Sequence, residues 1–334
     1  MVAGSIRGAV LTVNFTDIER AHQRIARLIT RTPLLNSPRL DAIADRRLWL
    51  KAEPLQVTGS FKFRGACSAI SALSSEALDR GVIAYSSGNH AQGIALAAKL
   101  FKTRATIVMP HDAPANKVAN TRSYGADVVH YERGVESRED IGADLARRHG
   151  LTLVKPYDDP AVIAGQGTVG LELSEQMAER KLSVSAILCC CGGGGLSAGI
   201  ATAMAATNPG VTLYTAEPEG FDDTARSLSL GERVANETEQ GSICDAIVTP
   251  TPGEITFPIL KALAGGGFAV GDDQTLRAMR YAFDTLKLVI EPGGAVALAA
   301  ALFADNLPSS DDLVVIVSGG NVDEAMFAKA LTIS

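Results

Sequence analysis

A lysine flanked by two phenylalanines is the first candidate for chemistry in this sequence. Lys62 lies in VTGSFKFRGA, between Phe61 and Phe63, where a short stretch rich in glycine and serine precedes a predicted helix. Apolar and aromatic neighbours disfavour the ammonium form of lysine, and the neutral amine is the form that makes a Schiff base with a carbonyl group. Most lysines instead keep their ammonium group at the surface, and the spacing alone does not decide between the two.

Four consecutive glycines form a second candidate. The segment CCCGGGGLSAG places Gly192–Gly195 directly after an apolar run and before the predicted helix LSAGIATAMAA. Without side chains in the way, backbone N–H groups can crowd around an anion, and the start of a helix adds a favourable dipole. The pattern favours a phosphate-binding loop over a purely structural turn.

The same loop also fits the binding of a dinucleotide. Gly193, Gly195 and Ala198 match the spacing G-x-G-x-x-A, and Glu217 ends the next predicted strand, about where an acid that binds ribose belongs. An NAD-dependent dehydrogenase is therefore an alternative from a different class of enzyme. It explains the glycines but leaves Lys62 without a role.

Two further segments bring polar groups to the ends of predicted strands. In YSSGNHAQG, a strand gives way to a helix at Ser86, Ser87, Asn89 and His90, so that hydroxyls, an amide and free backbone donors meet. A helix cap accounts for one serine but not for the amide and the imidazole. In the same way, VVIVSGGNVD delivers Ser318 at the end of a buried strand, before two glycines.

Short β-rich runs alternate with helical stretches along the chain, which is typical of βαβ units and parallel sheets. Strands are predicted at RLWLKAE, GVIAYSS, ATIVMP, DVVHYE, LTLVKP, AILCCC, TLYTAE and DLVVIVSGG. Between about Gly81 and Pro156 the units are short and self-contained, which indicates a four-stranded domain inserted into a larger one. We expect the functional cleft between the two, because ligands bind at the carboxyl ends of parallel strands and at domain interfaces.

In combination, these segments resemble the fold-type II pyridoxal-phosphate enzymes, specifically their serine/threonine dehydratase and serine racemase branch. SFKFRGA, SSGNHAQG, AGQGT, the four-glycine loop and SGGNVD all belong to that family's pattern, and the resemblance runs from RTPLLNSPRLD to SGGNVD. It implies an α/β fold of two domains, similar to tryptophan synthase β, with parallel-rich sheets flanked by helices. Residues 1–75 and 158–334 would form the large domain, and residues 76–157 the small one.

The resemblance also implies pyridoxal 5'-phosphate as the cofactor, with a role for each motif. Lys62 would carry the cofactor, and Phe61 would lie beside it. Asn89 would bond the pyridoxal 3-hydroxyl, and Ser318 would face the pyridine nitrogen. The phosphate would be held by the backbone N–H groups of Gly192, Gly193, Gly194, Gly195 and Leu196.

Residues on the substrate side follow from the same resemblance. The loop that receives the substrate carboxylate in this family corresponds to Ser86, Ser87, Asn89 and His90. Ser87 matches the acid/base residue of racemases, on the face opposite the lysine. Arg138 matches an arginine that contacts the substrate carboxylate in racemases, although a solvated helix position explains it equally well. Tyr157 stands where eukaryotic racemases have an asparagine, which weakens the expectation of racemase specificity.

A turn with two carboxylates is the last candidate site. In AEPEGFDD, Glu217 and Asp223 flank a turn whose main-chain carbonyl at Phe221 offers a third oxygen. Oxygen ligands of this kind suit Mg²⁺ or Ca²⁺, and the resembled branch has a divalent-cation site at this spacing. The segment therefore predicts a metal site, which assigns Glu217 to the metal and not to a ribose. An acidic surface turn is the plainer explanation.

The leading prediction is a dehydratase that converts a β-hydroxy amino acid such as L-threonine or L-serine to the 2-oxo acid and ammonia. A serine facing the ring nitrogen holds a proton on that nitrogen less firmly than a carboxylate does, which favours prompt loss of the β-substituent.

Alternatives are the dehydration of L-threo-3-hydroxyaspartate, a step in hydroxyectoine breakdown, serine racemisation, and cofactor binding without catalysis. Cysteine synthases share the fold, but their glycine loop normally carries threonines and their asparagine loop lacks the histidine. The chain ends about ten residues after SGGNVDEA, so we expect a catabolic enzyme without a regulatory domain.

Composition sets the remaining expectations. The 334 residues carry a net charge of −6 without a run of like charges, which disfavours nucleic acids and anionic membranes as partners. No signal peptide or membrane-length apolar run is evident. The five cysteines fit buried free thiols in a reducing compartment, so we expect a cytoplasmic protein. The partner is a small amino acid substrate, and family analogy suggests a homodimer.

Overall fold

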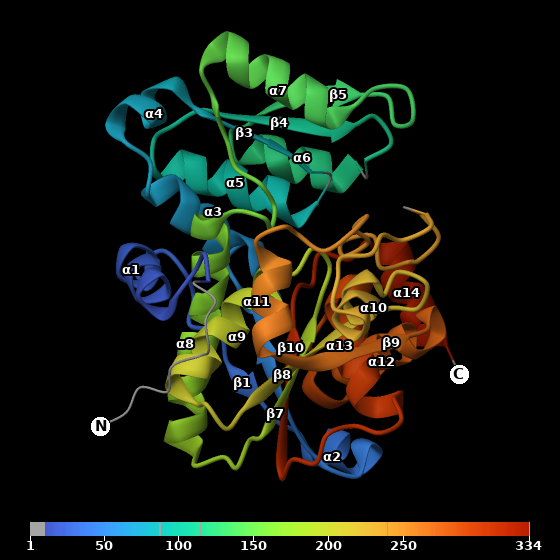
Figure 1. Cartoon of the computed structure of the whole chain (residues 1–334). Helices are drawn as coiled ribbons and strands as arrows, with labels where there is room; N and C mark the ends of the chain where they lie inside the picture. The colour runs from blue at the N-terminus through green and yellow to red at the C-terminus, as the bar shows by residue number, and fades with distance from the viewer. Residues whose placement is uncertain (1–10, 87, 114, 239, 334) are drawn as a thin grey trace.

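Two separate β-sheets organise the chain, the smaller above the larger in the view of Figure 1. The computed structural model describes residues 11–333 except residues 87, 114 and 239. The larger sheet has the order β1-β2-β10-β7-β8-β9 and the smaller one the order β5-β4-β3-β6. Among the described strands only β1 and β2 pair antiparallel.

The strands of the larger sheet are β1 (Leu34–Leu35), β2 (Arg47–Ala52), β7 (Ala186–Cys190), β8 (Thr212–Pro218), β9 (Ala264–Val270) and β10 (Asp312–Val317). Those of the smaller sheet are β3 (Val82–Tyr85), β4 (Ala105–Pro110), β5 (Asp127–Tyr131) and β6 (Thr152–Leu153). β7 and β10 lie in the middle of their sheet and are buried along their whole length. Such continuous apolar runs are expected where helices cover both faces of a parallel sheet.

The first helices are α1 (Phe15–Ile25), α2 (Pro38–Ala44), the 3₁₀ turn η1 (Glu53–Leu55), α3 (Lys62–Ser71), α4 (Ser75–Arg80), α5 (Asn89–Leu100), α6 (Ala115–Ser123) and α7 (Arg138–His149). The later ones are α8 (Pro160–Arg180), α9 (Gly195–Thr207), α10 (Asp223–Leu230), α11 (Thr256–Leu263), α12 (Asp272–Leu286), α13 (Pro292–Phe303) and α14 (Glu324–Thr332). No helix in the described part of the chain is long and apolar enough to cross a membrane.

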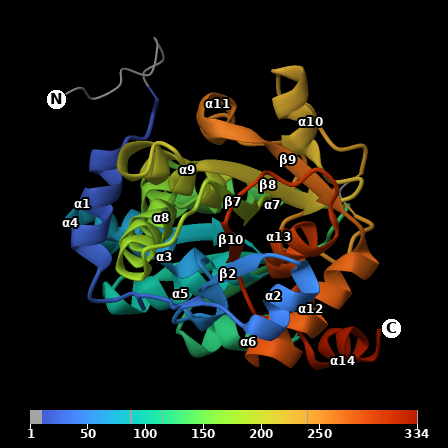
Figure 2. The same cartoon turned by 90° about the horizontal axis from the view of Figure 1, so that it is seen from below.

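Two hydrophobic cores lie on opposite faces of the larger sheet. Leu313, Val315 and Val317 of β10 pack in a core with α12 and α13, while Val314 and Ile316 pack in a second core with α8 and α9. Figure 2 shows α13 on one side of the strands and α8 with α9 on the other. This alternation follows from the two-residue period of a strand, and it makes β10 a rigid base for the residues after it.

Glycines allow α8 and α9 to pack backbone to backbone. A Cβ on Gly199 would lie 2.6 Å from the backbone nitrogen of Gly167, and one on Gly167 would meet the carbonyl oxygen of Gly199 at 3.0 Å. This contact fixes the direction of α9, which begins at the four-glycine loop.

The α/β fold with parallel-rich sheets flanked by helices is confirmed. Each of the eight predicted strand segments contains a strand, and the four strands between Gly81 and Pro156 form the smaller sheet. β1 and β9 were not predicted. The hydrophobic core beneath the smaller sheet also includes Phe63 and Ile70 of α3, which precede residue 76. The exact domain boundaries stay a prediction.

Candidate active site

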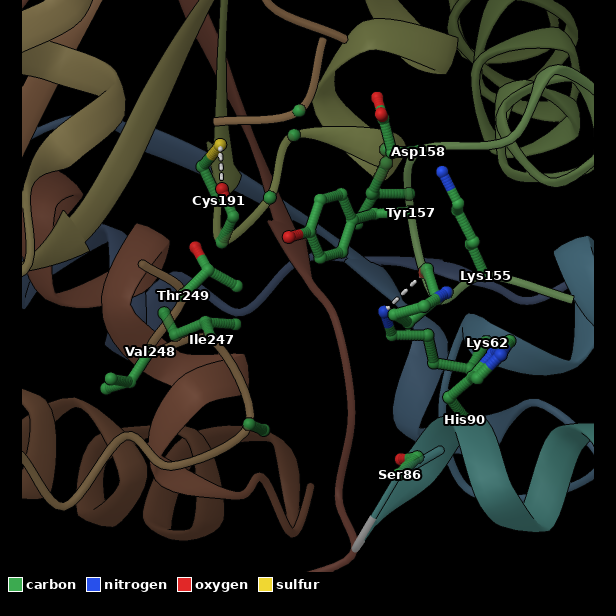
Figure 3. A pocket seen from close by; sticks show the side chains of 18 of the residues that line it. Lys62, Ser86, His90, Lys155, Tyr157, Asp158, Cys191, Ile247, Val248 and Thr249 are labelled. Atoms are coloured by element: carbon green, nitrogen blue, oxygen red, sulfur yellow. Dashed lines mark hydrogen bonds between the residues drawn. The ribbon is translucent and has the colours of Figure 1, made fainter. Parts of the chain in front are cut away.

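A cavity of about 490 Å³ lies between the two sheets (Figure 3). Residues at or just after the carboxyl ends of β3, β7 and β10 line it, together with the segments that precede α8 and α11. Parallel strands expose free backbone groups at these ends, where ligands commonly bind. The predicted Lys62, Asn89, Ser318 and Gly192–Leu196 all lie on its walls.

Lys62 is the first residue of α3, and its amine reaches the cavity wall. The Nζ atom donates a hydrogen bond to the carbonyl oxygen of Pro156 at 2.9 Å and lies 5.1 Å from the centre of the Phe61 ring. Burial lowers the pKa of Lys62 to about 8, and Glu291 offsets only part of that shift. The positive end of the α3 dipole disfavours the ammonium form further. At pH 7 about a tenth of the amine is therefore neutral, far more than for a lysine with an ordinary pKa.

The four glycines form the turn between β7 and α9 and face the cavity. Gly194 has φ of +90°, a conformation that favours glycine, and α9 begins at the next residue. A Cβ on Gly193 would overlap the Tyr157 ring, and one on Gly192 would come within 2.8 Å of the carbonyl oxygen of Ile247. The first turn of a helix leaves N–H groups without intrahelical partners, so this loop offers donors to an anion.

Ser318 follows β10 directly and is almost fully buried, with 4% of its surface exposed. Its carbonyl oxygen accepts a hydrogen bond from the N–H of Phe61 at 3.1 Å, and Ser60 forms a β-bridge with Gly319. These backbone contacts hold the segment that carries Lys62 against the segment that carries Ser318. The serine hydroxyl is a neutral polar group, and β10 fixes its place on the cavity wall.

Asn89 lies at the start of α5, where both ends of its amide are bonded across the cleft. Its Nδ2 donates to Glu291 Oε1 at 2.5 Å, and its Oδ1 accepts from Asn321 Nδ2 at 2.7 Å. Burial raises the pKa of Glu291 to about 7, and both Lys117 and Lys62 counteract this shift. An amide has two N–H groups and two lone pairs on its oxygen, so one of each remains for a ligand.

The other residues of the SSGNH segment take different places. The Oγ of Ser86 accepts a hydrogen bond from the N–H of Gly88 at 3.2 Å, and Ser86 lines the cavity. His90 Nε2 lies 2.9 Å from the carbonyl oxygen of Val154, and since a carbonyl only accepts, Nε2 carries the proton. Burial lowers the pKa of His90 to about 3, so the ring is neutral. Ser87, the predicted acid/base residue, lies outside the described residues.

Arg138 begins α7 and also lies on the cavity wall. Its Nε donates to Glu139 Oε1 at 2.7 Å, and its guanidinium carbon lies 5.6 Å from the centre of the Tyr85 ring. Lys117 of α6 also lines the cavity and forms an ion pair at 3.2 Å with Asp245, which lies between α10 and α11. Each of these two cations is thus paired with a carboxylate that lines the same cavity.

The comparison with known families identifies the family of this chain. The model of the family described as "Pyridoxal-phosphate dependent enzyme" matches residues 25–319. The chain belongs to the pyridoxal-phosphate-dependent enzymes.

Relatives within this family cover nearly the whole chain. L-threo-3-hydroxyaspartate ammonia-lyase of Pseudomonas sp. is 43% identical over 318 residues, which is 95% of this chain and 98% of that protein. Serine racemase of Dictyostelium discoideum is 40% identical over 324 residues, with 96% and 98% covered. The crystal structure of a threonine deaminase from T.th. has 45% identity and a TM-score of 0.87, covering 93% of this chain and 99% of that one.

The cavity of this pyridoxal-phosphate-dependent enzyme suits a cofactor with a phosphate, an aldehyde and an aromatic ring. The glycine loop packs so closely against its neighbours that only glycine fits, which leaves its backbone N–H groups as the donors it offers to a phosphate. Lys62 has a lowered pKa, and Phe61 offers an apolar face beside the amine. The residues present therefore fit pyridoxal phosphate. The role of each individual residue stays a prediction.

The predicted metal ligands lie together but away from the cavity. Glu217 ends β8 and accepts hydrogen bonds from the N–H groups of Thr224 and Ala225 at 2.9 and 2.8 Å. Asp223 begins α10, with Oδ1 bonded to Asn236 at 2.7 Å and Oδ2 buried without a partner among the described residues. Phe221 lies in the turn between them and is 7% exposed. Glu217, Phe221 and Asp223 are not among the described residues that line the cavity.

A bound cation would suit the electrostatics of this turn. Burial raises the pKa of Asp223 to about 6, and burial together with Asp223 raises that of Glu217 well above its ordinary value. A cation would favour both carboxylates in their charged form and give Asp223 Oδ2 a partner. Among the described residues, no group of three His, Cys, Asp or Glu side chains has the geometry of a metal site, so a cation here needs main-chain oxygen.

Two of the residues around Asn89 were missed by the sequence reasoning. Glu291 is 3% exposed and contacts Asn89, while Asn321 joins Asn89 to the carbonyl oxygen of Thr58. A signal existed for Glu291, because it is a carboxylate within the apolar run LKLVIEPGGAVALAAALF. A buried charge in such a run is rare without a partner.

Proposed function

We propose that this enzyme is an ammonia-lyase that removes water and then ammonia from a β-hydroxy amino acid. One observation carries the proposal: the Lys62 amine, the Gly192–Leu196 loop and Ser318 line the same cavity. In this proposal Lys62 binds pyridoxal phosphate, the loop holds its phosphate, and Ser318 faces the ring nitrogen. When bound, the cofactor withdraws electrons from the α-carbon of the substrate.

Several features of the chain support elimination. Lys62 Nζ, with its pKa near 8, can accept a proton from the α-carbon at neutral pH. Ser318 offers a hydroxyl, which holds a proton at the ring nitrogen less firmly than a carboxylate would. The β-hydroxyl then leaves before other reactions compete, and together with the proton taken from the α-carbon it makes up the water that is lost.

The substrate proposal starts from an amino acid with a second carboxylate. The relative from Pseudomonas sp. is named for L-threo-3-hydroxyaspartate. Three cations, Lys117, Arg138 and Lys155, line the cavity, where a second carboxylate can contact them. Lys117 and Arg138 would then exchange or share their present partners, Asp245 and Glu139. We therefore propose L-threo-3-hydroxyaspartate as the first substrate to test, with L-threonine and L-serine after it.

Serine racemisation is the second candidate, because the Dictyostelium relative with 40% identity carries that name. Racemisation needs an acid on the face opposite Lys62, and Ser87 is the residue proposed for it.

We also propose that Mg²⁺ or Ca²⁺ binds at Glu217, Asp223 and the carbonyl of Phe221. Such a cation would brace the turn after β8 and would not touch the substrate.

The test is a panel of L- and D-β-hydroxy amino acids, assayed for ammonia, for 2-oxo acid and for the opposite enantiomer. We expect ammonia and 2-oxo acid in equal amounts, fastest with L-threo-3-hydroxyaspartate. Production of D-serine without ammonia would favour the racemase. Normal cofactor binding without either product would leave a pyridoxal-phosphate protein that lacks the proposed activity.

A further inference from the structure

The carbonyl oxygen of Gly193 is held by two hydrogen bonds from beyond the glycine loop. Thr256, at the start of α11, donates its hydroxyl at 2.6 Å, and the N–H of Gly253 donates at 3.3 Å. Thr256 is fully buried, and its hydroxyl must be the donor in this bond, because a carbonyl oxygen only accepts. The shorter of the two bonds therefore depends on one side chain, 63 residues away in the chain.

This bond sets the direction of the next N–H group. In a trans peptide the C=O of Gly193 and the N–H of Gly194 lie in one rigid plane and point in opposite directions. No cis peptide is present among the described residues. Gly194 lines the cavity, whereas Thr256 is not among the described lining residues. Because Thr256 holds the carbonyl oxygen of Gly193 on its own side of the loop, the N–H of Gly194 points away from Thr256.

The packing around Thr256 leaves the loop little freedom. A Cβ on Gly194 would lie 2.9 Å from Thr256 Oγ1, so the hydroxyl fits directly against the glycine backbone. Thr256 itself is held in place, because the N–H of the preceding Ile255 donates to Asp158 Oδ1 at 2.8 Å. Asp158 is in turn the neighbour of Tyr157, whose ring covers Gly193.

We propose that Thr256 is a positioning residue for the cofactor phosphate, which it aligns through Gly193 and Gly194 without touching the cofactor. The inference rests on the proposal that the Gly192–Leu196 loop binds the phosphate. A glycine loop without side chains is easily reoriented, since glycine adopts many backbone conformations. An external hydrogen bond that selects one orientation raises phosphate affinity, because less order is lost on binding.

The test compares two ligands that differ only in the phosphate. Dissociation constants of pyridoxal 5'-phosphate and of pyridoxal are measured for the full-length chain after removal of its cofactor. The variants are Thr256→Val, which keeps the shape but loses the hydroxyl, and Thr256→Ser, which keeps the hydroxyl. Thr202→Val is the matched control, because Thr202 is a buried threonine of α9 whose hydroxyl bonds within the helix, to Ala198 at 2.9 Å.

We expect Thr256→Val to weaken pyridoxal phosphate about tenfold while pyridoxal changes less than about twofold. Thr256→Ser and Thr202→Val should keep the preference of the unaltered chain. A threonine needed only for packing would weaken both ligands equally. An unchanged preference in Thr256→Val would therefore overturn the inference.

Two further outcomes are distinguishable. If the unaltered chain binds both ligands equally, the glycine loop does not hold the phosphate, and the proposed site itself fails. If Thr256→Val does not fold, Thr256→Cys takes its place, because a thiol is a much weaker donor of nearly the same size. That variant should lose part of the preference for pyridoxal phosphate, and a full preference would again overturn the inference.

Discussion

Two lysines with lowered pKa values show how surroundings separate a structural amine from a reactive one. Burial lowers the pKa of both Lys51 and Lys62. The ammonium of Lys51, however, lies 2.6 Å from Glu172 and donates to the Thr32 carbonyl as well, so its charge is matched. The bonded partner of Lys62 is a neutral carbonyl, and its carboxylate neighbour Glu291 has a pKa near 7. Lys62 is therefore the lysine suited to act as nucleophile and base.

Replacing Lys62 by alanine tests this assignment. The variant should lose ammonia release by about 10³-fold or more, because both the cofactor link and the base are removed. Borohydride should attach the cofactor permanently to the unaltered chain but not to Lys62→Ala, as mass spectrometry can show. The exposed Lys329→Ala serves as control and should retain activity. Full activity in Lys62→Ala would mean that another amine does the chemistry.

Glu291 gives the enzyme a predictable dependence of stability on pH. Its pKa is raised from 4.5 to about 7 in the folded chain, so folding favours the protonated form. The stability gained from that proton is complete below pH 4.5, declines as the pH rises, and is lost above about pH 7. The difference of about 2.5 pKa units corresponds to about 3 kcal/mol.

Glu291→Gln should remove this part of the dependence, because the amide keeps an acceptor for Asn89 but does not ionise. Urea unfolding at about pH 5 and at about pH 8 measures how much the free energy of unfolding changes between the two pH values. The loss of unfolding free energy between the two pH values should be smaller in the variant by up to about 3 kcal/mol. Without a bound cation, Asp223 contributes a dependence of the same sign, so some of the loss remains. Equal losses in both proteins would show that Glu291 is ionised throughout.

At the scale of elements, the sequence predicted those strands and turns that are marked by residues close together in the chain. β7 and β10 are continuous apolar runs, and the turn after β7 is marked by its glycines. β9 was missed because AGGGFAV has three glycines, and glycine carries no side chain that favours a strand. It pairs with β8 all the same, and Gly267 gives room to the nearby Thr215 and Ala225.

The candidate site was predictable to the extent that its residues lie in short motifs. Lys62, Asn89 and the glycine loop each stand in such a segment. Glu291 contacts Asn89, 202 residues away, and Thr256 contacts Gly193, 63 residues away. Contacts of that range arise only when the sheets bring distant segments together, so spacing along the sequence carries no trace of them. These contacts become visible only in the folded structure, where the segments lie side by side.

The turn between β8 and α10 is the element whose stability should depend on a cation. Glu217 bonds the first N–H groups of α10, and the Thr224 hydroxyl donates to the carbonyl oxygen of Gly192 at 3.4 Å. The proposed cation is thereby connected to the glycine loop through one residue. Chelation should leave two buried carboxylates without a counter-charge and loosen both the turn and the loop.

The chain in EDTA should therefore melt about 5 °C lower than the chain in Mg²⁺ at about 100 times the dissociation constant of the ion. EDTA should also weaken binding of the cofactor. Glu217→Gln should resemble the chelated chain and respond little to added Mg²⁺. Glu219→Gln, in the same turn but outside the proposed ligand set, is the control and should respond like the unaltered chain. A melting temperature insensitive to EDTA would exclude the cation.

At the scale of the whole molecule, a buried charged network holds α3, the helix that begins with Lys62. Arg64, in the first turn of α3, bonds Glu53 at 2.8 Å and Glu172 at 2.7 Å. Lys51 bonds Glu172 as well, so the network joins β2, η1, α3 and α8. Although burial lowers the pKa of Arg64, the two carboxylates raise it above its ordinary value, and the guanidinium stays charged.

Removing Arg64 should therefore destabilise the whole fold. Arg64→Met keeps the apolar stem but leaves Glu53 and Glu172 buried with too little positive charge, at a cost of about 3–5 kcal/mol in unfolding free energy. Arg31 offers the matched contrast, because its side chain is 44% exposed where it pairs with Glu179 at 2.7 Å. Arg31→Met should cost less than about 1 kcal/mol, since water and salt screen that pair. Urea unfolding of both variants at about pH 7 decides the matter. Similar small losses would mean that water reaches the network and that α3, with Lys62 at its start, is held mainly by apolar packing.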